Sequence, residues 1–274
     1  MSFSFEGRYQ ILEKINQGGI ANVYRVKDRE KNETMALKEL LPHLALDRRV
    51  VREFYREAKL AAKFDHPNVI KIFRLGKKRG VPCLIMEYVE GKNLKELIIR
   101  GDKLLKEPLR IILGVARGLN HVHQYGIIHR DIKPENILIS TKGEVKITDF
   151  GLARKDGKLS RLFGSGVDGT LAYMSPEQIR GERVDERSDI YSFGVTMYEI
   201  LAGRIPFAGE DRESLIKMHL DKRVVPKPPS VYNDILPPLE ELTLKALEKN
   251  PSRRYQSVAE MLVDLEKTWR TFYE

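Results

Sequence analysis

The chain has 274 residues, 42% hydrophobic and 32% charged, which is enough for one large domain or two modest lobes. Its 48 Lys and Arg against 39 Asp and Glu give a net charge of +9. The basic residues are scattered and no aromatic residues are interleaved with them, so we expect no nucleic-acid partner. The single cysteine, Cys83, lies in an apolar run and excludes an intrachain disulfide and a cysteine-based metal site.

The first residues of the chain do not have the pattern of a signal peptide. No apolar signal segment precedes Gly7, and no run of about 18 apolar residues occurs. We therefore expect a cytoplasmic chain without a membrane segment. The same sequence would also fit a piece of a longer, membrane-anchored protein.

The first third of the chain predicts strands and one helix. Asp47 is the expected N-cap of a helix that runs to about Phe64, where His66-Pro67-Asn68 ends it. A Gly18-Gly19 turn joins the first two strands, and the polar turn at 90–92 marks the expected boundary between two lobes. The predicted strands are residues 8–14, 21–28, 34–40, 69–75 and 83–88.

The remainder predicts mostly helices. Apolar residues repeat at helical spacing over 109–122, and Gly126 follows as an expected C′ residue. Residues 137–139 and 145–148 predict a hairpin, and 188–201 are apolar nearly all round, which indicates a buried helix. Ser257 and Glu260 have capping-box spacing for a last helix. A small β-rich part before a larger α-rich part predicts an α+β fold.

Two short motifs indicate the chemistry. The first is His129-Arg130-Asp131-Ile132-Lys133-Pro134-Glu135-Asn136, and Asp149-Phe150-Gly151 follows one hairpin later. Asp131 would supply a base for a hydroxyl group. Asn136 and Asp149 would supply two oxygen ligands for Mg²⁺. Phosphoryl transfer from ATP needs these parts.

These motifs resemble the catalytic and metal-binding loops of the eukaryotic-type (Hanks-type) Ser/Thr protein kinases. The resemblance covers residues 8–270, and Ser-Pro-Glu-Gln at 175–178 and Arg-Tyr-Gln-Ser-Val-Ala-Glu-Met at 254–261 are similar to bacterial members. It implies a bilobal kinase fold, with an N-lobe over 8–88, a hinge over 87–91 and a C-lobe over 92–270.

The resemblance also implies roles for individual residues. Lys38 would hold the α- and β-phosphates of ATP, Glu57 would pair with Lys38, and Lys133 would steady the γ-phosphate beside Asp131. The cofactors would be ATP and Mg²⁺, for which Mn²⁺ could substitute. The residues that would contact the nucleotide or its metal are Asn16, Gly18, Gly19, Val23, Ala36, Lys38, Met86, Glu87, Val89, Asn136, Leu138 and Asp149. In the glycine-rich turn, Asn16 and Ala21 stand where the family has glycine.

Other positions match structural parts of the family. We expect His129 and Phe150 to be packed side chains. Thr170 would touch the catalytic aspartate, Asp189 would brace the catalytic loop, and Glu177 would form a buried ion pair with Arg254. The segment 152–175 resembles an activation segment. Its hydroxyl residues before Asp168 are Ser160 and Ser165, where we expect autophosphorylation.

The sequence therefore predicts a Ser/Thr protein kinase that transfers the γ-phosphate of Mg-ATP to Ser or Thr hydroxyls of protein substrates. Homodimers could carry out the autophosphorylation in trans. The alternative is a pseudokinase that binds ATP or acts as a scaffold, which only the degenerate glycine turn favours. A small-molecule phosphotransferase is a third reading, and the Gly169-Thr170 and Ser-Pro-Glu segment argues against it.

Overall fold

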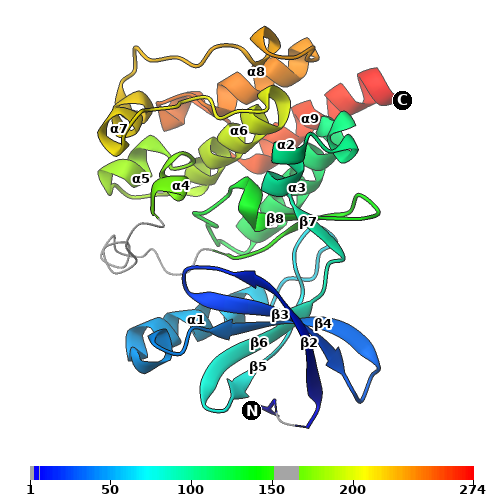
Figure 1. Ribbon diagram of the computed structural model, residues 1–274. Coiled ribbons are helices and arrows are strands. Elements are labelled where there is room, and N and C mark those ends of the chain that lie inside the picture. Colours follow the sequence, from blue (N-terminus) through cyan, green and yellow to red (C-terminus); the bar gives the residue numbers. More distant parts are fainter. Residues whose placement is uncertain (1–2, 6, 151–166) are drawn as a thin grey trace.

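The computed structural model describes residues 3–5, 7–150 and 167–274 (Figure 1). Gly151, Ser160 and Ser165 lie outside these residues. The described chain forms a small β-rich part, which contains the first strands and α1, and a larger part made mostly of helices (Figure 1). None of its helices is both long enough and apolar enough to cross a bilayer.

The N-terminal part is built on a six-stranded sheet with the order β1-β5-β6-β4-β3-β2. Neighbouring strands are antiparallel except β1, which pairs parallel with β5. Five of the strands were expected, whereas β1 is too short to leave a sequence pattern. The strands are β1 Phe3–Ser4, β2 Tyr9–Gln17, β3 Ala21–Asp28, β4 Glu33–Leu40, β5 Ile72–Lys78 and β6 Val81–Glu87.

One helix, α1 (Arg48–Ala61), packs on this sheet. The Asp47 side chain caps it by accepting from the Arg49 N–H, as expected. The apolar face of α1 enters the main core through Val50, Phe54, Ala58 and Ala61, so burial of that face holds the helix on the sheet.

The start of β5 differs from the expected residue 69. Val69 forms a parallel bridge with Ile147, and the Ile70 N–H donates to the Ile147 carbonyl at 2.9 Å. These apolar residues therefore tie the two parts of the molecule together, and the strand begins only at Ile72.

A second, three-stranded sheet has the order β7 (Gly91–Asn93), β8 (Ile137–Ser140), β9 (Val145–Ile147). The expected polar turn at 90–92 is wrong, because Gly91 pairs with Ser140 and Lys92 with Ile139. A Cβ on Gly91 would lie 1.9 Å from the Ile139 carbonyl oxygen, so glycine is needed for this close pairing.

Helices make up most of the C-terminal part. The residues at 188–201 lie in α6, which is buried along nearly its whole length and ends at Gly203 with a φ of 69°. Gly126, after α3, also has the expected positive φ, of 67°. The helices are α2 Leu94–Arg100, α3 Pro108–Gln124, α4 Val167–Leu171, α5 Pro176–Arg180, α6 Glu186–Ala202, α7 Arg212–Leu220, α8 Pro237–Ala246 and α9 Val258–Tyr273.

The cap of α9 is half of the expected capping box. The Ser257 hydroxyl accepts from the Glu260 N–H at 3.1 Å, as the spacing predicts. The Glu260 carboxylate, however, accepts from the Gln256 N–H and not from that of Ser257. A continuous core joins α1 and β9 to α3, α6 and α9, so Asp149, two residues after β9, lies where the two parts meet.

Candidate active site

The loop that carries Asp131 is held from below by Asp189 on α6. The Asp189 carboxylate is fully buried and accepts the N–H groups of His129 and Arg130, both at 2.7 Å. Arg130 has a φ of 67°, and these two hydrogen bonds hold its backbone in that uncommon conformation. The expected bracing role of Asp189 is confirmed.

His129 is a packed side chain, as expected. Its ring is fully buried, Nε2 lies 3.1 Å from the Thr148 carbonyl and Nδ1 accepts from the Asp131 N–H. Burial lowers the pKa of His129, against the charges of nearby aspartates. The His129 and Phe150 rings are 5.0 Å apart, and Phe150 also packs on Phe64. These contacts join the loop of Asp131 to the segment of Asp149.

The two carboxylate oxygens of Asp131 have different surroundings. Oδ2 lies 3.0 Å from the Lys133 ammonium and accepts from Asn136 Nδ2 at 3.0 Å. Oδ1 is buried and has no hydrogen-bond partner. A buried carboxylate oxygen without a donor is costly. This oxygen is therefore suited to accept a hydrogen bond from a ligand hydroxyl.

We expected Thr170 to contact Asp131, and this expectation is wrong. Its hydroxyl accepts from the Lys133 ammonium at 2.9 Å, and Lys133 in turn contacts Asp131. The long Lys133 side chain lies between the two, so the threonine acts on the aspartate through the lysine.

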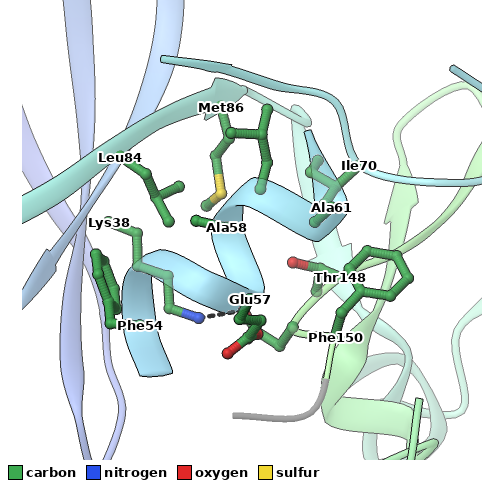
Figure 2. Close-up of a pocket in the computed structure, with 12 residues that line it drawn as sticks. Lys38, Phe54, Glu57, Ala58, Ala61, Ile70, Leu84, Met86, Thr148 and Phe150 are labelled. Carbon is green, nitrogen blue, oxygen red and sulfur yellow. Dashed lines mark hydrogen bonds and ion pairs between the residues drawn. The ribbon is translucent and has the colours of Figure 1, made fainter. Parts of the chain in front are cut away.

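Lys38, on β4, extends toward the helix that carries Glu57 (Figure 2). Its ammonium forms an ion pair with Asp149 Oδ1. Burial, the largest single effect, opposes the charge on each partner, but their attraction together with that of other nearby charges outweighs it. The pKa of Lys38 is raised and that of Asp149 is lowered. Both groups are therefore charged near neutral pH.

Glu57 is near Lys38 but is not its ion-pair partner among the described residues. Glu57 Oε2 is buried without a hydrogen-bond partner, and burial raises the pKa of Glu57 well above its usual range despite the charge of Lys38. The expected Lys38–Glu57 ion pair is thus replaced by Lys38–Asp149. The sequence shows two carboxylates but not which one the fold places on the lysine.

The expected metal ligands fit an ion that keeps few protein ligands. The Asn136 Nδ2 group donates to both the carboxylate and the main-chain carbonyl of Asp131. The Oδ1 atom of Asn136 is therefore left to bind a metal ion. Asp149 has a φ of 57° and a side chain that is 40% exposed. No cluster of three or more His, Cys, Asp or Glu suited to a metal was found in the described ranges. One carboxylate and one amide oxygen suit Mg²⁺ bound together with phosphates.

The expected adenine-binding residues gather at one edge of the core. Ala36 on β4 pairs with Met86 on β6, and Val23, Val89 and Leu138 pack against the same core. The Val89 N–H and C=O have no main-chain hydrogen-bond partner in the described part of the chain. Met86 also lines an apolar pocket behind Lys38 (Figure 2), whose lining is Lys38, Phe54, Glu57, Ala58, Ala61, Ile70, Ile72, Leu84, Met86, Thr148, Asp149 and Phe150.

The glycine turn between β2 and β3 leaves space beside its backbone. The Gly18 N–H donates to the Ala21 carbonyl at 2.9 Å. A Cβ on Gly18 would meet nothing closer than 3.6 Å, and one on Gly19 would meet nothing within 4 Å. Neither glycine has a positive φ. Neither the backbone conformation nor the packing of the chain requires glycine at these two positions. The space beside the backbone would instead allow phosphates to approach its N–H groups.

Residues that follow position 166 contact the same site. Glu177 and Arg254 form the expected buried ion pair, with oxygen–nitrogen distances of 2.7 and 2.9 Å. We did not predict Gln178, whose side chain donates to the Arg130 carbonyl at 3.0 Å. The signal was present, because Ser175 and Gln178 have capping-box spacing and form that box in α5.

This arrangement has the fold of a bilobal protein kinase. The structure resembles the crystallised PknI kinase domain of Mycobacterium tuberculosis, with a TM-score of 0.73 and 25% identity over 95% of both chains. The family model described as the protein kinase domain matches residues 9–265. The chain belongs to the protein kinase family, whose members use ATP and a divalent metal ion and act on proteins.

Curated relatives agree with this assignment. A probable serine/threonine-protein kinase of Streptomyces coelicolor is 40% identical over 268 residues, which are 95% of this chain and 40% of the relative. The serine/threonine-protein kinase PrkC of Bacillus subtilis is 41% identical over 263 residues, 94% of this chain and 40% of the relative. The chain thus spans about two fifths of the length of the relatives that it matches.

Proposed function

We propose that this chain is the catalytic domain of a Ser/Thr protein kinase, which transfers the γ-phosphate of Mg-ATP to Ser or Thr hydroxyls of proteins. The observation that carries the proposal is the Asp131 carboxylate, which Lys133 and Asn136 hold by one oxygen while the other is buried and unpaired. The relatives named above as serine/threonine-protein kinases support the choice of acceptor.

In this proposal the residues mainly position groups and balance charge. Asp131 Oδ1 accepts the hydrogen bond of the acceptor hydroxyl and orients its oxygen toward the phosphorus. Lys133 keeps the carboxylate in place and adds positive charge beside the transferred group. Mg-ATP supplies the phosphoryl group and neutralises part of its charge, and Asn136 and Asp149 would hold the metal.

Lys38 would release Asp149 for the metal and turn to the α- and β-phosphates. Glu57, buried and without a partner on Oε2, is near enough to take over Lys38 as its counter-ion. The glycine turn would cover the phosphates, and Val23, Ala36, Met86 and Leu138 would enclose the adenine, with the Glu87 and Val89 main chain as hydrogen-bond partners.

Further parts of the assignment remain predictions. We assign residues 8–270 to the kinase domain and 87–91 to the hinge. Mg²⁺ is the preferred metal and Mn²⁺ a substitute. We also predict a cytoplasmic location, protein rather than nucleic-acid partners, and autophosphorylation in trans within a homodimer. Ser160 and Ser165 are the predicted acceptors.

The test is intact-protein mass spectrometry after phosphatase-treated protein is incubated with Mg²⁺ and ATP, with Asp149→Asn as the inactive control. We expect added phosphate in the wild type alone, and loss of it in Ser160→Ala/Ser165→Ala. Replacing Mg²⁺ with Mn²⁺ tests the metal. If neither the protein nor a basic Ser/Thr peptide gains phosphate while ATP still binds, the chain is a pseudokinase.

The pseudokinase alternative has little support. Asp131, Asn136 and Asp149 lie together with Lys38 and Lys133, and the relatives are named as kinases. The degenerate glycine turn, on which that alternative rested, has room beside both of its glycines.

A further inference from the structure

Three residues from distant positions in the C-terminal part, Lys95, Tyr173 and Glu199, form a compact polar cluster. Glu199 on α6 forms an ion pair with Lys95 on α2, through one carboxylate oxygen. The other oxygen accepts from the hydroxyl of Tyr173. The Lys95 ammonium also lies 3.3 Å from the Tyr173 hydroxyl oxygen. None of the roles proposed above uses this cluster.

The cluster is connected to the catalytic loop by a short chain of contacts. The Tyr173 N–H donates to the Thr170 carbonyl at 3.1 Å, and the Thr170 hydroxyl accepts from Lys133, which contacts Asp131. Burial and then Glu199 raise the pKa of Tyr173, and the charge of Glu135, in the same loop as Asp131, adds to this rise. Tyr173 thus belongs to the segment that borders Asp131 through Thr170 and Lys133, and a peptide approaches this segment when its hydroxyl reaches Asp131.

Lys95 is the member of the cluster that solvent reaches. Its side chain is 30% exposed, whereas that of Glu199 is 4% exposed and the Tyr173 residue is also buried. A buried carboxylate is stable only beside a cation, and removal of that cation leaves a buried negative charge that strongly attracts another cation. As long as Lys95 is present, the chain itself supplies this cation.

We propose that Lys95 sets the charge preference of the peptide-binding surface, because it is a built-in counter-ion for Glu199. With Lys95 present, Glu199 is not available to a basic side chain of the substrate next to the acceptor hydroxyl. Without Lys95, the carboxylate attracts such a side chain. Without Glu199, the unpaired Lys95 ammonium attracts an acidic one. The proposal rests on the kinase function proposed above.

The test uses peptides with one Ser acceptor and a single Arg, norleucine or Glu placed in turn at each flanking position. We expect Lys95→Met to raise kcat/KM for the best Arg peptide about tenfold relative to its norleucine counterpart, mainly through a lower KM. Glu199→Gln should shift the ratio toward the Glu peptide by a similar factor. Lys95→Arg should keep the wild-type preference.

Lys245→Met is the matched control. Lys245 also pairs with a glutamate, Glu260, and lies over a tyrosine ring, that of Tyr255, but it is on α8 away from the catalytic loop. Its replacement should leave the peptide ratios unchanged. A purely structural role of Lys95 would lower kcat/KM for all three peptides by one common factor, and that result would overturn the proposal.

Autophosphorylation, measured on the same samples by intact mass, separates this inference from the kinase function. If phosphate is transferred but Lys95→Met and Glu199→Gln keep the wild-type charge ratios, only the role of Lys95 is wrong. If the wild type transfers phosphate neither to itself nor to any peptide, the kinase function fails and this inference fails with it.

Discussion

The buried pair Glu177–Arg254 should be the most stability-sensitive ion pair that joins the segment after Thr170 to the C-terminal helices. The Arg254 guanidinium is fully buried and donates to both Glu177 oxygens at 2.7 and 2.9 Å. It also donates to the carbonyls of Arg187, Glu248 and Lys249. Arg254→Met keeps much of the side-chain volume but removes the charge and all of these donors.

The expected loss follows from what the substitution leaves behind. Removal of one partner of a buried ion pair costs about 3–5 kcal/mol, because the other charge stays buried. Three carbonyls lose a donor as well, so we expect a loss near the upper end of that range. Adding Glu177→Gln to Arg254→Met removes the stranded charge and should recover part of the loss.

The effect should depend on pH in a direction set by Glu177. Burial alone would raise its pKa, but the hydrogen bond and charge of Arg254, together with Ser188, lower it below the ordinary 4.5. The wild type therefore gains stability from Glu177 above about pH 4.5 and loses it as the pH falls through the lowered value. In Arg254→Met burial dominates, the pKa rises, and the destabilisation should be larger at pH 7 than at about pH 4.

Urea unfolding at both pH values, followed by circular dichroism, measures these differences. Arg223→Met is the control, since Arg223 is 88% exposed and pairs with Asp221 at the surface, where solvent screens ion pairs and they contribute little to stability. If Arg254→Met unfolds within about 1 kcal/mol of the control at pH 7, the reasoning from burial is refuted.

Four further changes test other parts of the molecule. Lys38→Met should lower kcat for a peptide substrate by about 10²–10³, because it removes a charged donor to the phosphates, and an unchanged kcat would exclude Lys38 from the site. Gly118→Ala should lower the free energy of unfolding by roughly 1–2 kcal/mol, since its Cβ would lie 2.6 Å from the Asn68 carbonyl oxygen and helix propensity offsets only part of that strain. In Gly19→Ala the added Cβ would have no atom within 4 Å, so the unfolding midpoint should not change. The KM for ATP should rise. Burial, and then the charge of Lys249, lower the pKa of His219 to about 3. Below pH 6.5 the unfolded chain therefore binds a proton that the folded chain does not, and stability falls by up to about 1.4 kcal/mol per pH unit. His219→Gln should lose this slope in urea titrations between pH 7 and 5, and parallel slopes in both proteins would assign it to other groups.

The sequence by itself determined the features that depend on neighbours in the chain. Asp131, Lys133 and Asn136 lie within six positions, so their contacts follow from one tight loop. The cap by Asp47 and the positive φ of Gly203 likewise involve residues within one helical turn. The sequence of α6 also indicated a buried helix, because its apolar residues lie nearly all round the helix and leave no continuous polar face.

The tertiary structure alone decided which of several possible partners meet. Lys38 pairs with Asp149 rather than Glu57, and Thr170 contacts Lys133 rather than Asp131. Similarly, Glu199 forms an ion pair with Lys95, which is 104 residues away in the sequence. A charge attracts every opposite charge in the chain, and local sequence carries no record of distance between elements. The packing of helices and sheets brings one partner within hydrogen-bonding reach and keeps the others outside it.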